Sequence, residues 1–419
     1  MTKENHIKKM NYQFDEATLC HTIFAGSARA GKTVAAMHFA KELVHVRRKE
    51  TGKGIRIIVM DTKQNWRKLA HDIEPECFHV YSLGGIDYPP LHINPWKVPQ
   101  GMHPKQWADI VIEIYSFSYG LWNCGGKQIL RDVVYELYDK AGVFKACNKE
   151  DWRTSDEIKS ASANVNFKVI YERICQRKAE MEKFNENNIQ DAYARLLERL
   201  SCFSCESSIE SKFFGNSDGL GVDELIEGKD EFQNKNLKGM GMITVLESKG
   251  LARTFYDFIF GVITSGFYHS AKTHESSFLS PNQNETILVI EDADTILIGS
   301  DSGPKNFPFL DNDTEFDQIM NHAADYGLYI FSITQRIYDM PSSVIKNSGL
   351  VFSGRTARPC DINTVAHICG WEGKMNEKDL KQLFYHLPIG TFVCQSVDDE
   401  NGKDAEPIII RIDNPNKEM

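Results

Sequence analysis

The chain has 419 residues, of which 42% are hydrophobic and 25% are charged. This composition is typical of a soluble globular protein, and the length suffices for one large domain or two. The formal net charge of −10 argues against a generally basic protein that coats DNA, but not against a channel that presents a few basic residues.

No apolar run reaches the roughly 18 residues of a transmembrane segment. The first residues, MTKENHIKKM, lack the apolar stretch of a signal peptide. The ten cysteines show no framework spacing, which favours reduced thiols. We therefore expect a cytoplasmic protein without a membrane span.

Residues 1–14 look like a flexible leader, and a strand, a glycine-rich loop and a helix are predicted after them. Residues 19–25 predict a buried strand and residues 33–46 predict a helix. Between them, GSARAGKT fits the pattern GxxxxGK[ST], in which backbone N–H groups and the new helix face the phosphates. The candidate nucleotide-binding residues are Gly26, Ser27, Ala28, Arg29, Ala30, Gly31, Lys32, Thr33 and Val34.

Two residues of this loop have specific expected roles. Lys32 would reach the β- and γ-phosphates of ATP, and Thr33 would bind Mg²⁺. The alternative is a glycine-rich turn that binds nothing, and the strand–loop–helix context disfavours it.

Helical patterns dominate the middle of the chain. Apolar residues recur at helical spacing in residues 104–140, and residues 150–215 are richer in charge but also helical. These patterns predict a helical insertion over residues 104–236. It would divide an α/β core into a first part, 15–103, and a second part, 237–419.

An acidic cluster follows the next buried strand. Residues 287–290 are apolar, and Glu291, Asp292 and Asp294 come directly after them. Carboxylates at the end of a buried strand need a cation. We expect Glu291 to hold Mg²⁺ through a water and Asp292 to orient and polarise the attacking water. Asp294 is expected to cap the next segment.

After this cluster, residues 299–313 form a Gly/Pro/Asp loop that is either a moving or pore-facing loop or a plain surface loop. A further apolar strand, 328–333, then precedes Gln335. If this strand lies beside the acidic one, Gln335 points at the γ-phosphate and reports its presence by changing hydrogen-bond partner. The alternative is a polar residue that only closes a strand.

These three segments, in this order, resemble the HerA/FtsK superfamily of P-loop ATPases, which includes DNA translocases and the ATPases of conjugation and type IV secretion. The segment IRIIVMDTKQNW resembles the second strand of that family, ending in Asp61. Asn94-Pro95 resembles an Asn-Pro segment of secretion-type members, and GTFVCQ resembles their late strand. The resemblance covers about residues 15–140 and 237–412.

The resemblance implies a RecA-like α/β core with a mainly parallel sheet and helices on both faces. It implies ATP and Mg²⁺ as cofactors and a homo-hexameric ring, and it favours movement of DNA through a central channel. The alternatives are an ATPase that energises conjugation or type IV secretion by acting on proteins, and a nucleotide-gated ring that recruits an effector in antiphage defence. A secretion role would place the chain at the periphery of a membrane complex.

The sequence departs from the family pattern at two places. The acidic pair is Glu291-Asp292, where the family often has Asp-Glu. The position at which many members carry an arginine, three before the glycine of the sensor strand, is Ala324. The resemblance therefore leaves the arginine that would complete a neighbour's site to Arg355, with Arg358 and Arg336 as alternatives.

Overall fold

A computed structural model describes most of the chain. The described residues are 19–47, 52–83, 88, 90–121, 125–181, 187–215, 219–226, 240–276, 285–297, 315–371, 375–396 and 408–412. The predicted leader, 1–14, and the predicted loop, 299–313, lie outside them.

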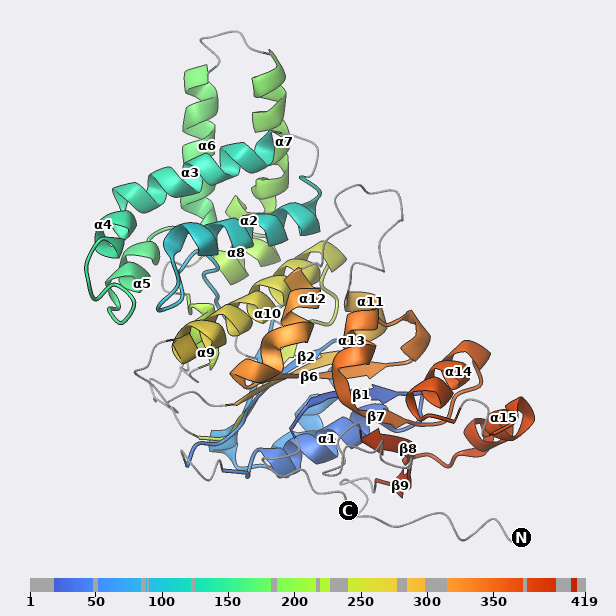
Figure 1. The fold of residues 1–419 in the computed structure, drawn as a ribbon. Helices are drawn as coiled ribbons and strands as arrows, with labels where there is room; N and C mark the ends of the chain where they lie inside the picture. Colours follow the sequence, from blue (N-terminus) through green and yellow to red (C-terminus); the bar gives the residue numbers. More distant parts are fainter. Residues whose placement is uncertain are drawn as a thin grey trace. The chain divides into compact units, whose positions relative to one another are not determined.

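The strands form one nine-stranded sheet among the described residues, in the order β3-β4-β2-β5-β6-β1-β7-β8-β9 (Figure 1). The pairs β2–β5, β5–β6, β6–β1 and β1–β7 are parallel, whereas β7–β8 and β8–β9 are antiparallel. The strands are β1 (His21–Ala25), β2 (Arg56–Asp61), β3 (Phe78–Ser82), β4 (Met242–Glu247), β5 (Thr286–Glu291), β6 (Leu328–Thr334), β7 (Ser348–Ser353), β8 (Thr391–Ser396) and β9 (Ile408–Arg411).

Helices cover both faces of this sheet, which explains why its central strands are apolar on both sides. Helix α1 (Lys32–Leu43) packs against β1 and β6, and α13 (Ser342–Asn347) contacts β1 from the other side (Figure 1). Phe24 of β1 stacks on Phe352 of β7, with 5.2 Å between ring centroids. The remaining helices of this part are α11 (Ala293–Ile296), α12 (Glu315–His322), α14 (Pro359–Ile368) and α15 (Glu377–His386).

The strand order decides where the functional residues meet. Strand β6 lies between the P-loop strand β1 and the acidic strand β5. Because these strands are parallel, their carboxyl ends reach the same edge of the sheet. The predicted neighbourhood of the sensor strand and the acidic strand is thereby confirmed, as is the predicted fold class, a mainly parallel sheet with helices on both faces.

By its contacts the chain divides into two compact units. The first unit comprises residues 1–79, 239–246 and 284–419, and the second comprises residues 80–238 and 247–283. The second unit thus contains α10, which contacts α2 and α9 of the same unit. The boundaries predicted from the sequence, with an insertion over 104–236, stay a prediction about the folding domains.

The second unit is mainly helical and has an aromatic core. The rings of Phe167 and Phe203 stack with 4.1 Å between centroids, and Phe214, Phe258 and Tyr115 pack around them. None of the helices in the described residues is both long and apolar enough to cross a membrane. The helices are α2 (Pro104–Tyr119), α3 (Gly126–Lys140), α4 (Val143–Cys147), α5 (Glu157–Ser162), α6 (Phe167–Met181), α7 (Asn187–Ser204), α8 (Ile209–Phe214), α9 (Val222–Ile226) and α10 (Arg253–Ser276).

Candidate active site

The P-loop connects the end of β1 to the start of α1, as the sequence predicts. Gly26 and Gly31 have φ angles of 135° and 99°, which only glycine adopts without strain. A Cβ atom on Gly31 would also lie 3.1 Å from the backbone nitrogen of Gly390. Both glycines are therefore needed for the shape of the loop.

Two distant backbone segments hold the P-loop in place. The carbonyl oxygen of Arg355, after β7, accepts hydrogen bonds from the Ser27 nitrogen at 2.7 Å and the Ser27 hydroxyl at 2.9 Å. The Gly390 nitrogen, before β8, donates to the Ala30 carbonyl at 3.0 Å. Both distant segments contribute only backbone groups to these contacts, so no motif in the sequence indicates them.

Lys32 is buried at the first position of α1. Its ammonium group donates to the Ser27 carbonyl at 2.9 Å and so lies across the loop. Burial and the nearby charge of Lys63 lower its pKa to about 8, although the acidic cluster opposes this shift. The ammonium is therefore held where charge compensation by a phosphate would be strongly favourable.

Glu291 ends β5 and is completely buried. Its Oε1 accepts a hydrogen bond of 3.2 Å from the Trp66 indole, whereas Oε2 is buried without a hydrogen-bond partner. Burial and the Asp61 carboxylate raise the pKa of Glu291, while Lys63 and hydrogen bonds from Trp66 and Thr33 oppose that rise.

Asp292 occupies a strained turn beside this carboxylate. Its φ angle is 51°, an uncommon value for a residue other than glycine. Oδ1 lies 2.6 Å from the Lys63 ammonium, and Oδ2 accepts a hydrogen bond of 3.0 Å from the Thr62 hydroxyl. The predicted water-activating group is thus bound on both oxygens in this structure.

Lys63 and Trp66 contact the acidic cluster, and the sequence interpretation did not single them out. The Asp61 carboxylate fixes their segment by accepting from the Lys63 nitrogen at 2.8 Å and the Trp66 nitrogen at 3.0 Å. Their position gave a signal that could have been used. They follow the second strand closely, and the carboxyl end of that strand reaches the same edge of the sheet as the acidic residues.

Asp294 connects the acidic turn to the sensor strand, and its side chain is not the expected helix cap. It accepts hydrogen bonds from the Thr334 hydroxyl at 2.8 Å and the Arg336 guanidinium at 3.0 Å. Helix α11 instead has Asp292 at its N-cap position, without a side-chain capping bond. The ends of β5 and β6 are thereby joined by side chains as well as by the sheet.

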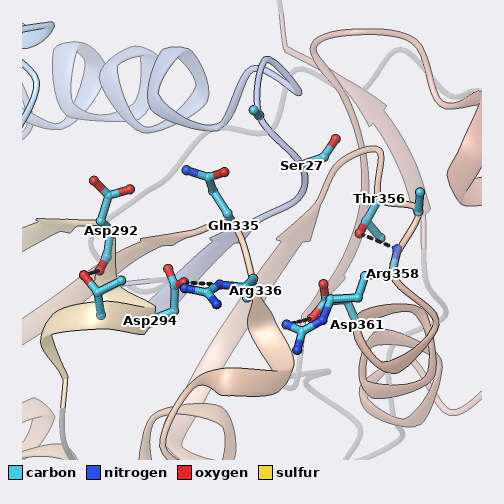
Figure 2. Close-up of a pocket in the computed structure, with 11 residues that line it drawn as sticks. Ser27, Asp292, Asp294, Gln335, Arg336, Thr356, Arg358 and Asp361 are labelled. Carbon is cyan, nitrogen blue, oxygen red and sulfur yellow. Dashed lines mark hydrogen bonds and ion pairs between the residues drawn. The ribbon is translucent and has the colours of Figure 1, made fainter.

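Asp292, Asp294 and Arg336 border a pocket of about 480 Å³ beside the P-loop, whereas Lys32 and Glu291 are not among its lining residues (Figure 2). Gln335 is exposed and lies between Asp292 and Ser27 in this view, and its contact with the γ-phosphate stays a prediction. The lining residues are Ser27, Ala28, Asp292, Asp294, Thr295, Gln335, Arg336, Thr356, Ala357, Arg358 and Asp361.

The three candidate arginines occupy different positions. Arg336 and Arg358 line the pocket and share the carboxylate of Asp339, at 3.4 Å and 2.9 Å. Arg355 is not among the lining residues, and its backbone carbonyl binds the P-loop of its own chain. Its role in a neighbouring subunit stays a prediction.

The donor set fits a nucleotide-borne Mg²⁺. In the described part of the chain, no group of three or more His, Cys, Asp or Glu residues could hold a metal by itself. Mg²⁺ usually binds proteins through one or two carboxylates, waters and substrate phosphates. Glu291 Oε2, which accepts no hydrogen bond from the described residues, provides one such oxygen, and Thr33 also contacts the Glu291 carboxylate.

Comparisons with known proteins agree on the fold. No protein-family model and no curated protein matches the sequence. Among solved structures, VirB4 of Thermoanaerobacter pseudethanolicus superimposes with a TM-score of 0.60 and 13% identity, over 95% of this chain and 90% of VirB4. The bacterial conjugative coupling protein TrwB, in an unbound form, gives 0.57 and 9% identity, over 99% of this chain and 91% of TrwB.

A second TrwB structure, in complex with ADP and Mg²⁺, gives a TM-score of 0.54 with 11% identity over 98% of this chain. At these identities the comparisons show similarity of the fold alone. The chain has the fold of VirB4 and TrwB, which agrees with the fold class that the sequence predicts.

Proposed function

We propose that this chain is a Mg²⁺-dependent ATPase that works as a conjugation-type motor. The observation that carries the proposal is the meeting of Lys32, Glu291 and Asp292 at one edge of the sheet, with a buried Glu291 oxygen that has no hydrogen-bond partner. The Lys63 ammonium lies 3.6 Å from this oxygen, but no donor in the described part of the chain makes a hydrogen bond to it, and a buried carboxylate oxygen in this state favours a bound ligand. Thr33 and, through a water, Glu291 would hold Mg²⁺ at this place, and the metal would compensate the charge of the carboxylate.

Each residue has a distinct proposed task. The P-loop backbone, residues 26–34, would bind the phosphates, and Lys32 would compensate the charge on the β- and γ-oxygens. Bound Mg²⁺ would supply Lewis-acid charge at the same oxygens. Asp292 would orient and deprotonate the attacking water, and Gln335 would contact the γ-phosphate.

The proposed assembly is a homo-hexamer that moves DNA through a central channel. The likeness to the conjugative coupling protein TrwB over 99% of this chain supports it. The likeness to VirB4 equally supports a second candidate, an ATPase that energises secretion by acting on proteins, and this role would place the chain at a membrane complex. Recruitment of an effector by a nucleotide-gated ring stays an alternative, and neither VirB4 nor TrwB supports it.

The test is ATP hydrolysis by the purified chain with and without Mg²⁺ and DNA. We expect Mg²⁺-dependent hydrolysis that DNA stimulates, and a loss of about 10²-fold or more in Lys32→Ala. Lys68→Ala is the matched control, because Lys68 is an exposed lysine of the same unit outside the site. Equal rates for Lys32→Ala and the wild type would refute the site, and hydrolysis without DNA stimulation would favour the secretion candidate.

A further inference from the structure

Lys63 places a positive charge between the two carboxylates that the proposed reaction needs. Its ammonium lies 2.6 Å from Asp292 Oδ1 and 3.6 Å from Glu291 Oε2. The Glu291 side chain is 0% exposed and that of Asp292 is 26% exposed, whereas the Lys63 side chain is 41% exposed. The cation thus reaches the buried acids from the solvent side.

The position of Lys63 conflicts with catalysis as the structure stands. A general base must offer a free oxygen to water, but Lys63 and Thr62 bind both oxygens of Asp292. The Glu291 oxygen nearest to Lys63 is the one without a hydrogen-bond partner, which is the oxygen that fits the metal shell. An ammonium ion and a hydrated Mg²⁺ cannot both occupy this space.

We propose that Thr62 and Lys63 form a latch in which the Lys63 ammonium substitutes for Mg²⁺ between Glu291 and Asp292 and keeps the site inactive until metal–nucleotide binds. This inference rests on the proposed function. The flexible four-carbon stem of lysine allows the charge to leave without backbone movement. Asp61, which anchors the backbone of Lys63 and Trp66, keeps the segment in place when the side chain moves.

The latch makes Lys63 a competitor of Mg²⁺. Removing its charge should leave the acidic pair without a cation, so that Mg²⁺ binds at lower concentration. The expected decrease is about threefold to tenfold, because the opposite charges are close but Lys63 is partly screened by solvent. Retaining the charge in Lys63→Arg should keep the Mg²⁺ requirement within about twofold of the wild type.

The experiment measures binding of the fluorescent nucleotide mant-ADP to the full chain while Mg²⁺ is titrated. We expect Lys63→Met to lower the Mg²⁺ concentration for half-maximal binding, and the matched control Lys68→Met to leave it unchanged. An unchanged or higher Mg²⁺ requirement in folded Lys63→Met would overturn the latch. Lys63→Gln, which retains polar character, replaces Lys63→Met if circular dichroism shows that the latter does not fold.

The same titration distinguishes the latch from the proposed function. If the wild type binds mant-ADP neither with nor without Mg²⁺, the proposed nucleotide site is wrong. If the wild type binds in a Mg²⁺-dependent manner and the Lys63 variants match it, only the latch is wrong. A purely structural role of Lys63 would lower the melting temperature but leave the Mg²⁺ requirement in place, and this too would overturn the latch.

Discussion

At the scale of single residues, the structure separates the two carboxylates of the acidic pair. Glu291 is the last residue of β5, is buried, and is held on one oxygen by the Trp66 indole. Asp292 leaves the strand in a left-handed turn and is partly exposed to the pocket. A buried carboxylate with one oxygen that accepts no hydrogen bond suits a metal shell, whereas a carboxylate at the pocket suits contact with water.

This difference predicts separate effects of the two amide substitutions. Asp292→Asn should retain Mg²⁺-dependent nucleotide binding and lose about 10²- to 10⁴-fold in hydrolysis, because the amide cannot accept the proton of water. Glu291→Gln should weaken Mg²⁺-dependent binding as well. Parallel mant-ADP titrations and steady-state ATPase assays measure both. Normal hydrolysis by Asp292→Asn together with an inactive Glu291→Gln would reverse the assignment.

The burial of His21 makes the stability of the fold depend on pH. Its Nδ1 accepts a hydrogen bond of 2.9 Å from the backbone nitrogen of Ile330, which requires a neutral ring. Burial lowers its pKa from the ordinary value of 6.5 to about 4. The His21 ring therefore takes up a proton more readily in the unfolded chain than in the folded one. The contribution of neutral His21 to stability is fully present above about pH 6.5 and is lost as the pH falls toward 4.

We expect the titration of His21 to lower the free energy of unfolding by about 2 kcal/mol as the pH falls from about 7 to about 5. Urea unfolding of the wild type and of His21→Gln at both values measures this contribution. The glutamine carbonyl can accept the same hydrogen bond but does not titrate, so the variant should lose less stability. Equal losses in the two proteins would show that His21 does not titrate as the burial of its ring requires.

At the scale of elements, the P-loop depends on strands that follow it by more than 300 positions. The segments after β7 and before β8 hold it by backbone hydrogen bonds to Ser27 and Ala30. The close approach of Gly390 leaves little space for a side chain on Gly31. The loop is thus shaped by the sheet around it and not by local preference alone.

A substitution at Gly31 should therefore damage both stability and binding. Gly31→Ala is expected to cost about 1 to 3 kcal/mol, because alanine would be strained at this φ angle and would press on Gly390. The matched control is Gly52→Ala, which also has a positive φ angle but no neighbour within 4 Å. Thermal unfolding and mant-ADP binding measure both variants, and retained nucleotide affinity in Gly31→Ala would contradict this account.

At the scale of the whole molecule, the open question is which chain completes the site. The pocket already contains Arg336 and Arg358, but both are paired with carboxylates. Fast hydrolysis needs an arginine directed at the γ-phosphate, worth about 10³- to 10⁵-fold in related enzymes. In the proposed hexamer a neighbouring subunit would supply it, and Arg355 is the first candidate.

Mixing two inactive variants tests this arrangement. Lys32→Ala lacks the phosphate contact and Arg355→Ala lacks the proposed arginine, so mixed rings would contain some complete sites and should regain part of the activity. Arg355→Ala retains the backbone carbonyl that binds Ser27, and its P-loop should be undisturbed. Intact rings without rescue would exclude Arg355 and direct the same test to Arg358 and Arg336. Full activity of a dilute monomer would refute the ring mechanism.

The sequence by itself determined the chemistry at the ends of individual strands. The P-loop from Gly26 to Thr33, the acidic residues after β5 and Gln335 after β6 were all recognisable, because strand periodicity and glycine spacing are local properties. Parallel strands then imply a common functional edge, and the α/β fold follows from these segments and their order. The resemblance to HerA/FtsK ATPases rests on the same segments.

Only the tertiary structure decided which groups hold these residues in place and which charge competes with a metal ion at the acidic pair. Lys63 is 229 positions from Asp292, and the Arg355 carbonyl is 328 positions from Ser27. No local pattern encodes a backbone carbonyl as an anchor or a lysine as a substitute for a metal ion. Such roles arise when β2, β5 and β7 bring their carboxyl ends to one edge, where burial and low dielectric make each unpaired charge costly.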